Sequence, residues 1–261
     1  MSRRANAVLA AGVSVFALSA PAASFASSGG GGLSPTSRPS TTAHAPAATS
    51  APAAASAPAT QPGNVTVTAS GNGMTLATRT SGFLRNQLRF TGSAPAADAG
   101  ATVEIERLGH QTGWTWAPTA HARVRSDGSF TVVWRANHIG RFSIRAVISS
   151  GQAARAATAS PALTLTVYRA AVATQYGAGF WGSTTACGEV LHRSTLGVAN
   201  RTLRCGTLVA IYYEGRTLVV PVIDRGPYAN GADWDLTVIT SRLLGMPGNE
   251  TIGAVSLPLR P

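Results

Sequence analysis

The sequence predicts a mainly β protein with two folded domains, a β-sandwich followed by a small closed barrel. Short runs of alternating or β-branched residues recur over residues 64–168, separated by glycine and asparagine turns. A second set of strand-like runs follows in residues 169–261, together with one short helix candidate. Two further segments, 1–26 and 27–63, precede the folded domains.

Residues 1–26 are predicted to be a secretory signal peptide. Arg3 and Arg4 precede an apolar run over residues 7–20, and small residues close the segment at Ala26. The run is shorter than the roughly 20 residues of a membrane-spanning helix. We therefore expect a secreted protein, associated with the cell wall, with no transmembrane segment in its mature form.

Residues 27–63 are predicted to be a disordered linker. The segment consists mainly of Pro, Ala, Ser, Thr and Gly and has almost no large apolar side chains. Such a segment cannot bury enough surface to offset the entropy lost on ordering, so we expect it to act as a tether.

Residues 64–168 are predicted to fold as a β-sandwich that resembles immunoglobulin-like modules. The expected strands are NVTVTA, QLRFTG, TVEIERL, HARVRS, SFTVVWR, RFSIRAVI and ALTLTVY. Asp127-Gly128 indicates a hairpin. Trp134 continues an alternating strand and is expected in the core, whereas Trp114 and Trp116 lie by a turn, where core packing and an exposed sugar-stacking face are both open.

The positive charge is concentrated in this domain. The chain has a formal net charge of +11, and all its cations are arginine. Residues 64–168 have ten arginines against four acidic residues, and residues 169–261 have eight against six. For an exported protein, this charge favours anionic wall polymers as partners over nucleic acid. The alternative is that the charge serves only solubility.

Residues 169–261 are predicted to form the barrel. The strands AAVATQY, TLVAIYY and TLVVPVI are followed by a helix in TVITSRLLGM, with Thr237 as N-cap and Gly245 as its end. Between the last strand and the helix lies VIDRGPYANGADWDL, which places Asp224 and Asp235 on either side of a loop rich in turn residues. We expect the two carboxylates to converge on one face. The alternative is that Asp224 only caps the turn or pairs with Arg225, and that Asp235 only caps the helix start.

Three motifs in this domain resemble the RlpA-like (rare lipoprotein A) family of double-psi β-barrels, which is related in fold to expansins and to family 45 endoglucanases. They are ATQYGAGFWGSTTACGEVL, LGVANRTLRCGTLVAI and VVPVIDRGPYANGADWDLT. The resemblance covers residues 171–257 and implies a six-stranded barrel with a groove for cell-wall polysaccharide. It also implies the lytic transglycosylase reaction on peptidoglycan.

The resemblance also suggests site residues. It implies catalytic roles for Asp224, Asp235 and Glu189, and groove positions for Thr174 and Tyr176. Three aromatic side chains are candidates for sugar contact, with core packing as the alternative: Tyr176, Trp181 and Tyr228. Asn200 replaces a histidine of catalytically active relatives and is expected to bind sugar without carrying a proton.

Cys187 and Cys205 are predicted to form a disulfide, because an even pair of cysteines in an exported chain is typically oxidised. His192 is the only histidine of this domain, so neither a metal site nor a cofactor is expected. The leading hypothesis is an exported protein that binds peptidoglycan glycan, and whether it also cleaves glycan stays open. The alternatives are a non-catalytic expansin-like binding module and a protein-docking domain.

Overall fold

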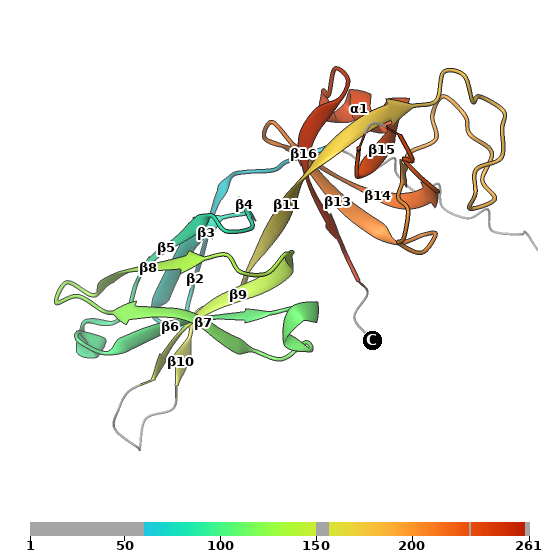
Figure 1. Cartoon of the computed structure of the whole chain (residues 1–261). Coiled ribbons are helices and arrows are strands. Elements are labelled where there is room, and N and C mark those ends of the chain that lie inside the picture. Colours follow the sequence, from blue (N-terminus) through green and yellow to red (C-terminus); the bar gives the residue numbers. More distant parts are fainter. Residues whose placement is uncertain (1–59, 150–156, 230, 259–261) are drawn as a thin grey trace, which may run out of the picture. The chain divides into compact units, whose positions relative to one another are not determined.

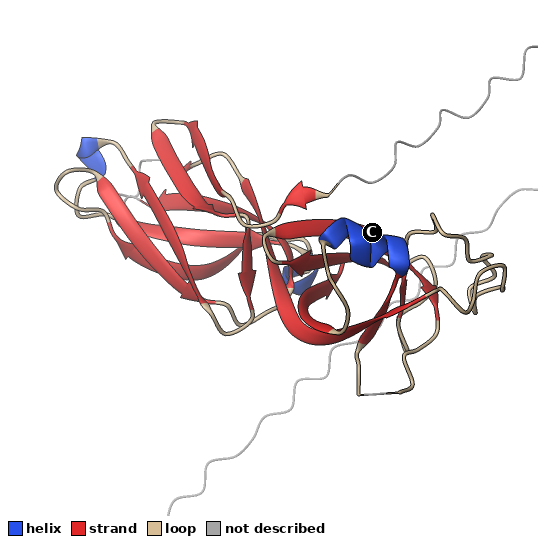
Figure 2. Cartoon of the chain, turned by 90° about the horizontal axis from the view of Figure 1, so that it is seen from above, coloured by secondary structure: helices blue, strands red, loops and turns tan. Residues whose placement is uncertain are grey.

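The structure is a computed structural model, and it describes residues 60–149, 157–229 and 231–258. The predicted signal peptide and residues 27–59 of the predicted linker lie outside these ranges. Strands make up almost all of the regular structure (Figures 1 and 2). No helix in the described ranges is both long enough and apolar enough to cross a membrane.

The first domain consists of two facing sheets. The first sheet has the order β2-β3-β5-β8, with the bounds Thr66–Gly71, Met74–Arg79, Gln87–Ser93 and Ser129–Arg135. The second sheet contains β7, β6, β9 and the first half of β11, with the bounds Ala117–Arg123, Thr102–Leu108, Gly140–Ser149 and Leu163–Tyr176. Short strands β4 (Ser81–Phe83) and β10 (Thr158–Ala159) extend the second sheet. Two 3₁₀ turns, η1 (Ala96–Asp98) and η2 (His110–Thr112), complete the domain.

The sandwich core lies between these sheets. Alternate residues of the strands point inward, such as Leu88 and Phe90 from one sheet and Phe142 and Ile144 from the other. Trp134 is 4% exposed, which confirms its predicted place in the core. The arrangement is compatible with the immunoglobulin-like prediction.

The predicted hairpin at Asp127-Gly128 is wrong. A turn does occur there, with Gly128 at φ 81°. However, β7 pairs with β6 and β8 pairs with β5, so the turn carries the chain from one sheet to the other. An Asp-Gly pair specifies the local turn but not the strands that flank it as partners.

The second domain is a closed six-stranded barrel, as predicted. Its strands run in the order β15-β12-β14-β13-β16-β11, and pairing of β11 with β15 closes the ring. The second half of β11 therefore belongs to this barrel. The remaining strands are β12 (Val198–Ala199), β13 (Leu208–Tyr213), β14 (Arg216–Asp224), β15 (Trp234–Thr237) and β16 (Glu250–Ser256).

Local sequence signals define the remaining elements of the barrel. Glu214 and Gly215 both have positive φ and join β13 to β14 as a tight hairpin. Helix α1 (Val238–Leu244) begins after Thr237, whose hydroxyl accepts a hydrogen bond from the Thr240 amide, and ends at Gly245 with φ 77°. Both helix boundaries confirm the prediction.

The last residues of the predicted linker are not disordered. Strand β1 (Gln61–Pro62) pairs with Arg216 and Thr217 of β14, and the Gly63 amide donates to the carbonyl of Gly215. The linker boundary therefore falls before residue 61, because backbone pairing with a barrel strand orders this segment without large apolar side chains.

Candidate functional site

The two aspartates of the predicted loop converge because one short strand lies between them. Ala199 of β12 is in register with Asp224 of β14 on one side and with Asp235 of β15 on the other. Since adjacent strands lie about 4.8 Å apart, the two aspartate backbones are about 10 Å apart across Ala199. All three residues line one groove of about 640 Å³. The small side chain of Ala199 leaves space between the carboxylates.

Asp235 is a half-buried carboxyl group with a hydroxyl donor. Its Oδ1 accepts a 2.8 Å hydrogen bond from Thr174 Oγ1, because the two residues are in register on the parallel strands β11 and β15. Burial raises the pKa of Asp235, the negative charge of Asp224 raises it further, and the bond from Thr174 opposes this shift. Asp235 therefore keeps its proton to a higher pH than an exposed aspartate and can donate it to a ligand.

Asp224, in contrast, is held by backbone donors. Its Oδ1 accepts 2.8 Å hydrogen bonds from the amides of Ala186 and Arg225. The guanidinium of Arg225 donates to the backbone carbonyl of Asp224. The predicted capping role is therefore present, but it engages one carboxylate oxygen, and the residue also lines the groove.

Tyr176 brings a phenol to this group of acids. Its hydroxyl oxygen is buried and has no hydrogen-bond partner in the described part of the chain. Burial raises the pKa of Tyr176 far above its ordinary value, and the charges of Asp224, Asp235 and Glu189 act in the same direction. The phenol thus stays protonated, and its buried O–H donor is left without an acceptor among the described residues.

Two exposed aromatic rings lie along the groove. Tyr228 is 78% exposed and Phe180 is 57% exposed. The Phe180 ring meets Tyr176 edge-on, with 6.4 Å between the ring centroids. Exposed aromatic faces beside hydrogen-bonding groups suit a carbohydrate ligand, because one side of a ring can pack on a sugar while polar groups bind its hydroxyls.

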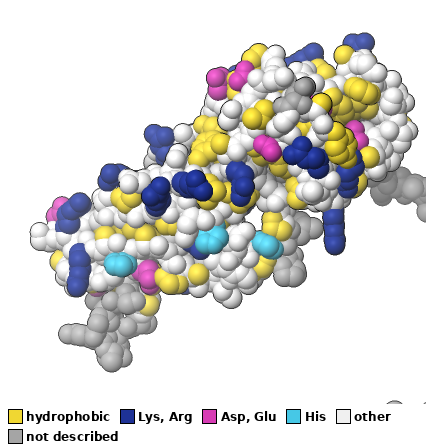
Figure 3. Space-filling model, viewed as in Figure 1, with side chains coloured by type: hydrophobic (Ala, Val, Ile, Leu, Met, Phe, Trp, Pro, Cys, Tyr) yellow, Lys and Arg dark blue, Asp and Glu magenta, His cyan; other side chains and the backbone are white. Residues whose placement is uncertain are grey.

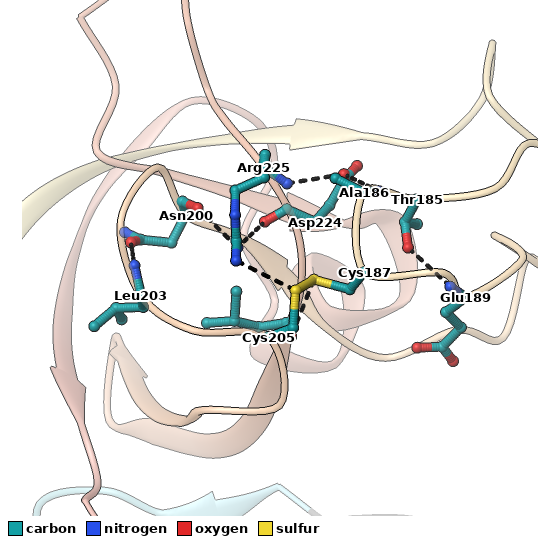
Figure 4. The surroundings of a disulfide bond; sticks show 10 residues. Thr185, Ala186, Cys187, Glu189, Asn200, Leu203, Cys205, Asp224 and Arg225 are labelled. Carbon is teal, nitrogen blue, oxygen red and sulfur yellow. Dashed lines mark hydrogen bonds between the residues drawn. A yellow bond between two sulfur atoms is a disulfide. The ribbon is translucent and has the colours of Figure 1, made fainter.

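The structure does not bring three of the predicted residues into the groove lining. Trp181 packs over Gly177, where a Cβ would lie 2.6 Å from the indole ring. Glu189 is exposed on a loop, and Figure 4 shows its carboxylate pointing away from Asp224. Asn200 Oδ1 accepts hydrogen bonds from the amides of Thr202 and Leu203, so this side chain stabilises a turn.

The guanidinium of Arg201 holds the loop between the two aspartates in place. Its Nη1 donates 2.9 Å hydrogen bonds to the carbonyls of Pro227 and Ala232. Its Nη2 lies 3.8 Å from Asp233 Oδ1. One guanidinium thus joins the two ends of the loop and holds Tyr228 at the groove.

The predicted disulfide between Cys187 and Cys205 is confirmed, with the Cα atoms 5.6 Å apart (Figure 4). It joins the loop that contains Ala186 to the segment before β13. Because the Ala186 amide donates to Asp224, the disulfide fixes one of the two donors that orient this carboxylate.

The groove residues that sequence reasoning missed include Phe180, Ala199 and Arg225. Phe180 directly precedes Trp181, and loop residues have no periodicity to indicate which neighbour faces the groove. Arg225 was considered only as an ion-pair partner of Asp224. Ala199 has no chemical signal of its own, since its importance comes from the two strands that flank it.

Comparison with known proteins agrees with this geometry. The family described as "Lytic transglycolase" matches residues 169–256. Over these residues, the C-terminal domain is similar to the RlpA-like double-psi β-barrel family. This confirms the resemblance carried by the three sequence motifs.

Three curated relatives are named "Probable endolytic peptidoglycan transglycosylase RlpA". The RlpA of Synechocystis is 34% identical over 122 residues, which is 46% of this chain and 38% of the relative. The RlpA of Nostoc is 40% identical over 28% of this chain and 20% of its own length. The RlpA of Aquifex aeolicus is 38% identical over 28% of this chain and 34% of its own.

The chain therefore matches less than half of the length of these RlpA proteins. Among solved structures, one titled "Biofilm associated protein - BSP domain" aligns with 74% of this chain and 24% of its own, at 14% identity and a TM-score of 0.22. A similarity this low supports no argument about fold or function.

Proposed function

We propose that this protein is exported to the cell wall, where the barrel groove binds glycan strands of peptidoglycan and cleaves them slowly as a lytic transglycosylase. The observation that carries the proposal is the placement of Asp235, with its raised pKa, across Ala199 from Asp224 in one groove. The names of the RlpA relatives support the choice of peptidoglycan as substrate.

In the proposed reaction, Asp235 acts first as an acid and then as a base. Its proton passes to the glycosidic oxygen as the bond from the muramyl C1 to that oxygen breaks. The negative charge of Asp224 stabilises the positive charge that develops at C1. The 6-hydroxyl of the same muramyl residue then attacks C1, and its proton returns to Asp235. The product has a 1,6-anhydro end, and no water is consumed.

Slow cleavage follows from Asn200. At this position, where active relatives are expected to have histidine, the chain has a group that cannot accept or release a proton near neutral pH. The Asn200 oxygen is also occupied by its turn. The basic sandwich has a separate proposed role, which is to bind an anionic polymer of the wall.

Purified sacculi provide the test. Sacculi are incubated with the protein, and anhydro-ended muropeptides are quantified by mass spectrometry. We expect such ends with the wild type and a decrease of about 100-fold or more with Asp235→Asn, which removes the general acid. Glu214→Gln removes one negative charge at the exposed β13–β14 turn, outside the groove, and should leave the yield unchanged. Glu189→Gln should have a small effect, because Glu189 does not line the groove.

The alternatives give different results in the same experiment. If the wild type binds sacculi but produces no anhydro ends, the barrel is a non-catalytic, expansin-like binding module; the exposed rings of Phe180 and Tyr228 favour this second candidate. If it neither binds nor cleaves sacculi, the proposal fails, and a protein-docking domain is the alternative to test next.

A further inference from the structure

The outward face of the first sheet of the sandwich has an unusual composition. Its outward positions, on β2, β3, β5 and β8, are mostly threonine and serine together with three arginines. These strands are fully described and contain no aspartate or glutamate. The exposed arginines are Arg79, Arg89 and Arg135, with Arg85 in the turn before β5. We call this outward surface of β2, β3, β5 and β8, with its four arginines, the arginine face.

The strand register and one hydrogen bond bring the four arginines together. Arg89 pairs with Val133 and Arg135 pairs with Gln87, so Arg89 and Arg135 are diagonal neighbours on one face, roughly 7–8 Å apart. Arg135 Nε donates to the Arg85 carbonyl. Arg79 lies on β3 beside β5, where the hydroxyl of the neighbouring Thr78 donates to the Arg89 carbonyl. In Figure 3, arginine side chains gather over the part of the sandwich that contains β5 and β8.

Among the described residues, these cations have no acidic partner. Within the described residues, none of the four forms an ion pair. The two acidic residues on strands of the sandwich, Glu104 and Glu106, belong to β6 of the other sheet, and Glu106 pairs there with Arg145. Like charges on neighbouring strands repel one another, so an anion that bridges them stabilises this face.

The other side chains of the face indicate which anion fits. Threonine and serine hydroxyls can bond both to phosphate oxygens and to polyol hydroxyls. The face has no exposed aromatic ring on which a nucleic acid base could stack. Its one large exposed apolar side chain is Val133, which is too little for insertion into a lipid surface. Arginine matches phosphate oxygens with its planar set of donors.

We propose that the arginine face is a binding site for a polyol phosphate polymer, a chain of phosphodiester groups joined by short polyols. Its location at the wall rests on the proposed function, but the binding chemistry does not. Such a site would hold the protein on the wall while the barrel groove engages glycan.

Immobilised poly(glycerol phosphate) tests the site with the full chain. Replacement of Arg79, Arg85, Arg89 and Arg135 by glutamine should weaken binding by roughly tenfold or more at physiological salt, and should make the salt dependence of the affinity shallower. The matched control replaces Arg169, Arg193, Arg204 and Arg242, which are exposed on the barrel outside the groove, and removes the same charge. We expect a change of less than about threefold for the control.

Several outcomes would overturn the proposal. Equal weakening in both variants would mean that only net charge matters. Tighter binding to single-stranded poly(A) or to anionic lipid vesicles than to poly(glycerol phosphate) would assign the face to another partner. Arg79→Gln/Arg89→Gln, which keeps the Arg135–Arg85 contact, replaces the four-residue variant if that variant does not fold. All of these variants should release anhydro ends from polymer-free sacculi at the wild-type rate. Failure of the polymer-binding proposal can therefore be told apart from failure of the proposed cleavage.

Discussion

At the scale of single residues, the pKa of Asp235 is raised by burial and then adjusted by two neighbours that act in opposite directions. The hydrogen bond from Thr174 lowers the pKa, and the charge of Asp224 raises it. Asp224→Asn removes the negative charge and should lower the pKa of Asp235. Thr174→Val removes the bond that favours the ionised form and should raise it. Titration of the Asp235 carboxyl by ¹³C NMR measures both shifts.

The same shifts should appear in the pH profile of cleavage. Because the proposed acid must be protonated, the rate falls as pH rises through the pKa of Asp235. We expect this decline at lower pH in Asp224→Asn and at higher pH in Thr174→Val. Shifts of the same sign in both variants would contradict the roles assigned to these neighbours.

Tyr176 gives a second prediction at this scale. Its buried hydroxyl lacks a protein partner within the described ranges, so Tyr176→Phe should leave the free energy of unfolding unchanged or raise it by up to about 1 kcal/mol. Binding of soluble glycan fragments should change little, because the hydroxyl oxygen is buried and does not face the groove solvent. Denaturant unfolding and isothermal titration calorimetry measure the two effects. A clear loss of stability would show that the hydroxyl has a hydrogen-bond partner in the fold, and clearly weaker binding would show that the ligand reaches it.

Residue identity predicted part of this site. Carboxyl groups such as those of Asp224 and Asp235 have few structural roles in an apolar barrel, so the sequence alone indicates both as candidates for the site. Asn200 was assigned to sugar binding, although an asparagine that begins a turn commonly bonds to the amides that follow it. That local preference prevailed over the expected ligand contact.

At the scale of elements, the disulfide controls the loop that holds Asp224. Cys187 and Cys205 are 18 residues apart, and a closed loop of this length stabilises a fold by about 3 kcal/mol in the chain-entropy account. Cys187→Ser/Cys205→Ser should lower the free energy of unfolding by about that amount, as measured by urea denaturation. Cleavage should also fall, because the Ala186 amide is no longer held at Asp224. Unchanged stability, or two free thiols in the unreduced wild type, would contradict this prediction.

Elements with their own periodicity were predictable, and those defined by distant partners were not. The alternation in QLRFTG and SFTVVWR predicted β5 and β8 directly. Strand β12 has only two residues, Val198 and Ala199, and exists because β14 and β15 flank it. No local pattern indicates such pairing, so the convergence of the two aspartates could be expected only from the composition of the loop and from family resemblance.

At the scale of the whole molecule, the unpaired positive charge and the acidic groove residues belong to different domains. The acidic groove belongs to the barrel, and the arginine face belongs to the first sheet of the sandwich. A neutral or weakly acidic glycan and an anionic polymer could therefore be bound at once without competing for one surface. The strongly basic composition, with a sequence pI of about 11.3, does not reveal this separation, because it averages over both domains.

Export is the remaining prediction at this scale. Residues 1–26 have the charged start, apolar run and small-residue end of a signal peptide, and a disulfide between Cys187 and Cys205 persists only in an oxidising compartment. When the chain is expressed with a functioning secretion system, we expect the exported protein to begin at Ser27 and to lack free thiols. Mass spectrometry of the intact protein, before and after thiol labelling, measures both. Expression of residues 27–261 in a reducing cytosol is the control and should give two labelled cysteines. An exported protein that retains Met1 would contradict cleavage, because the apolar run would then remain attached to the linker.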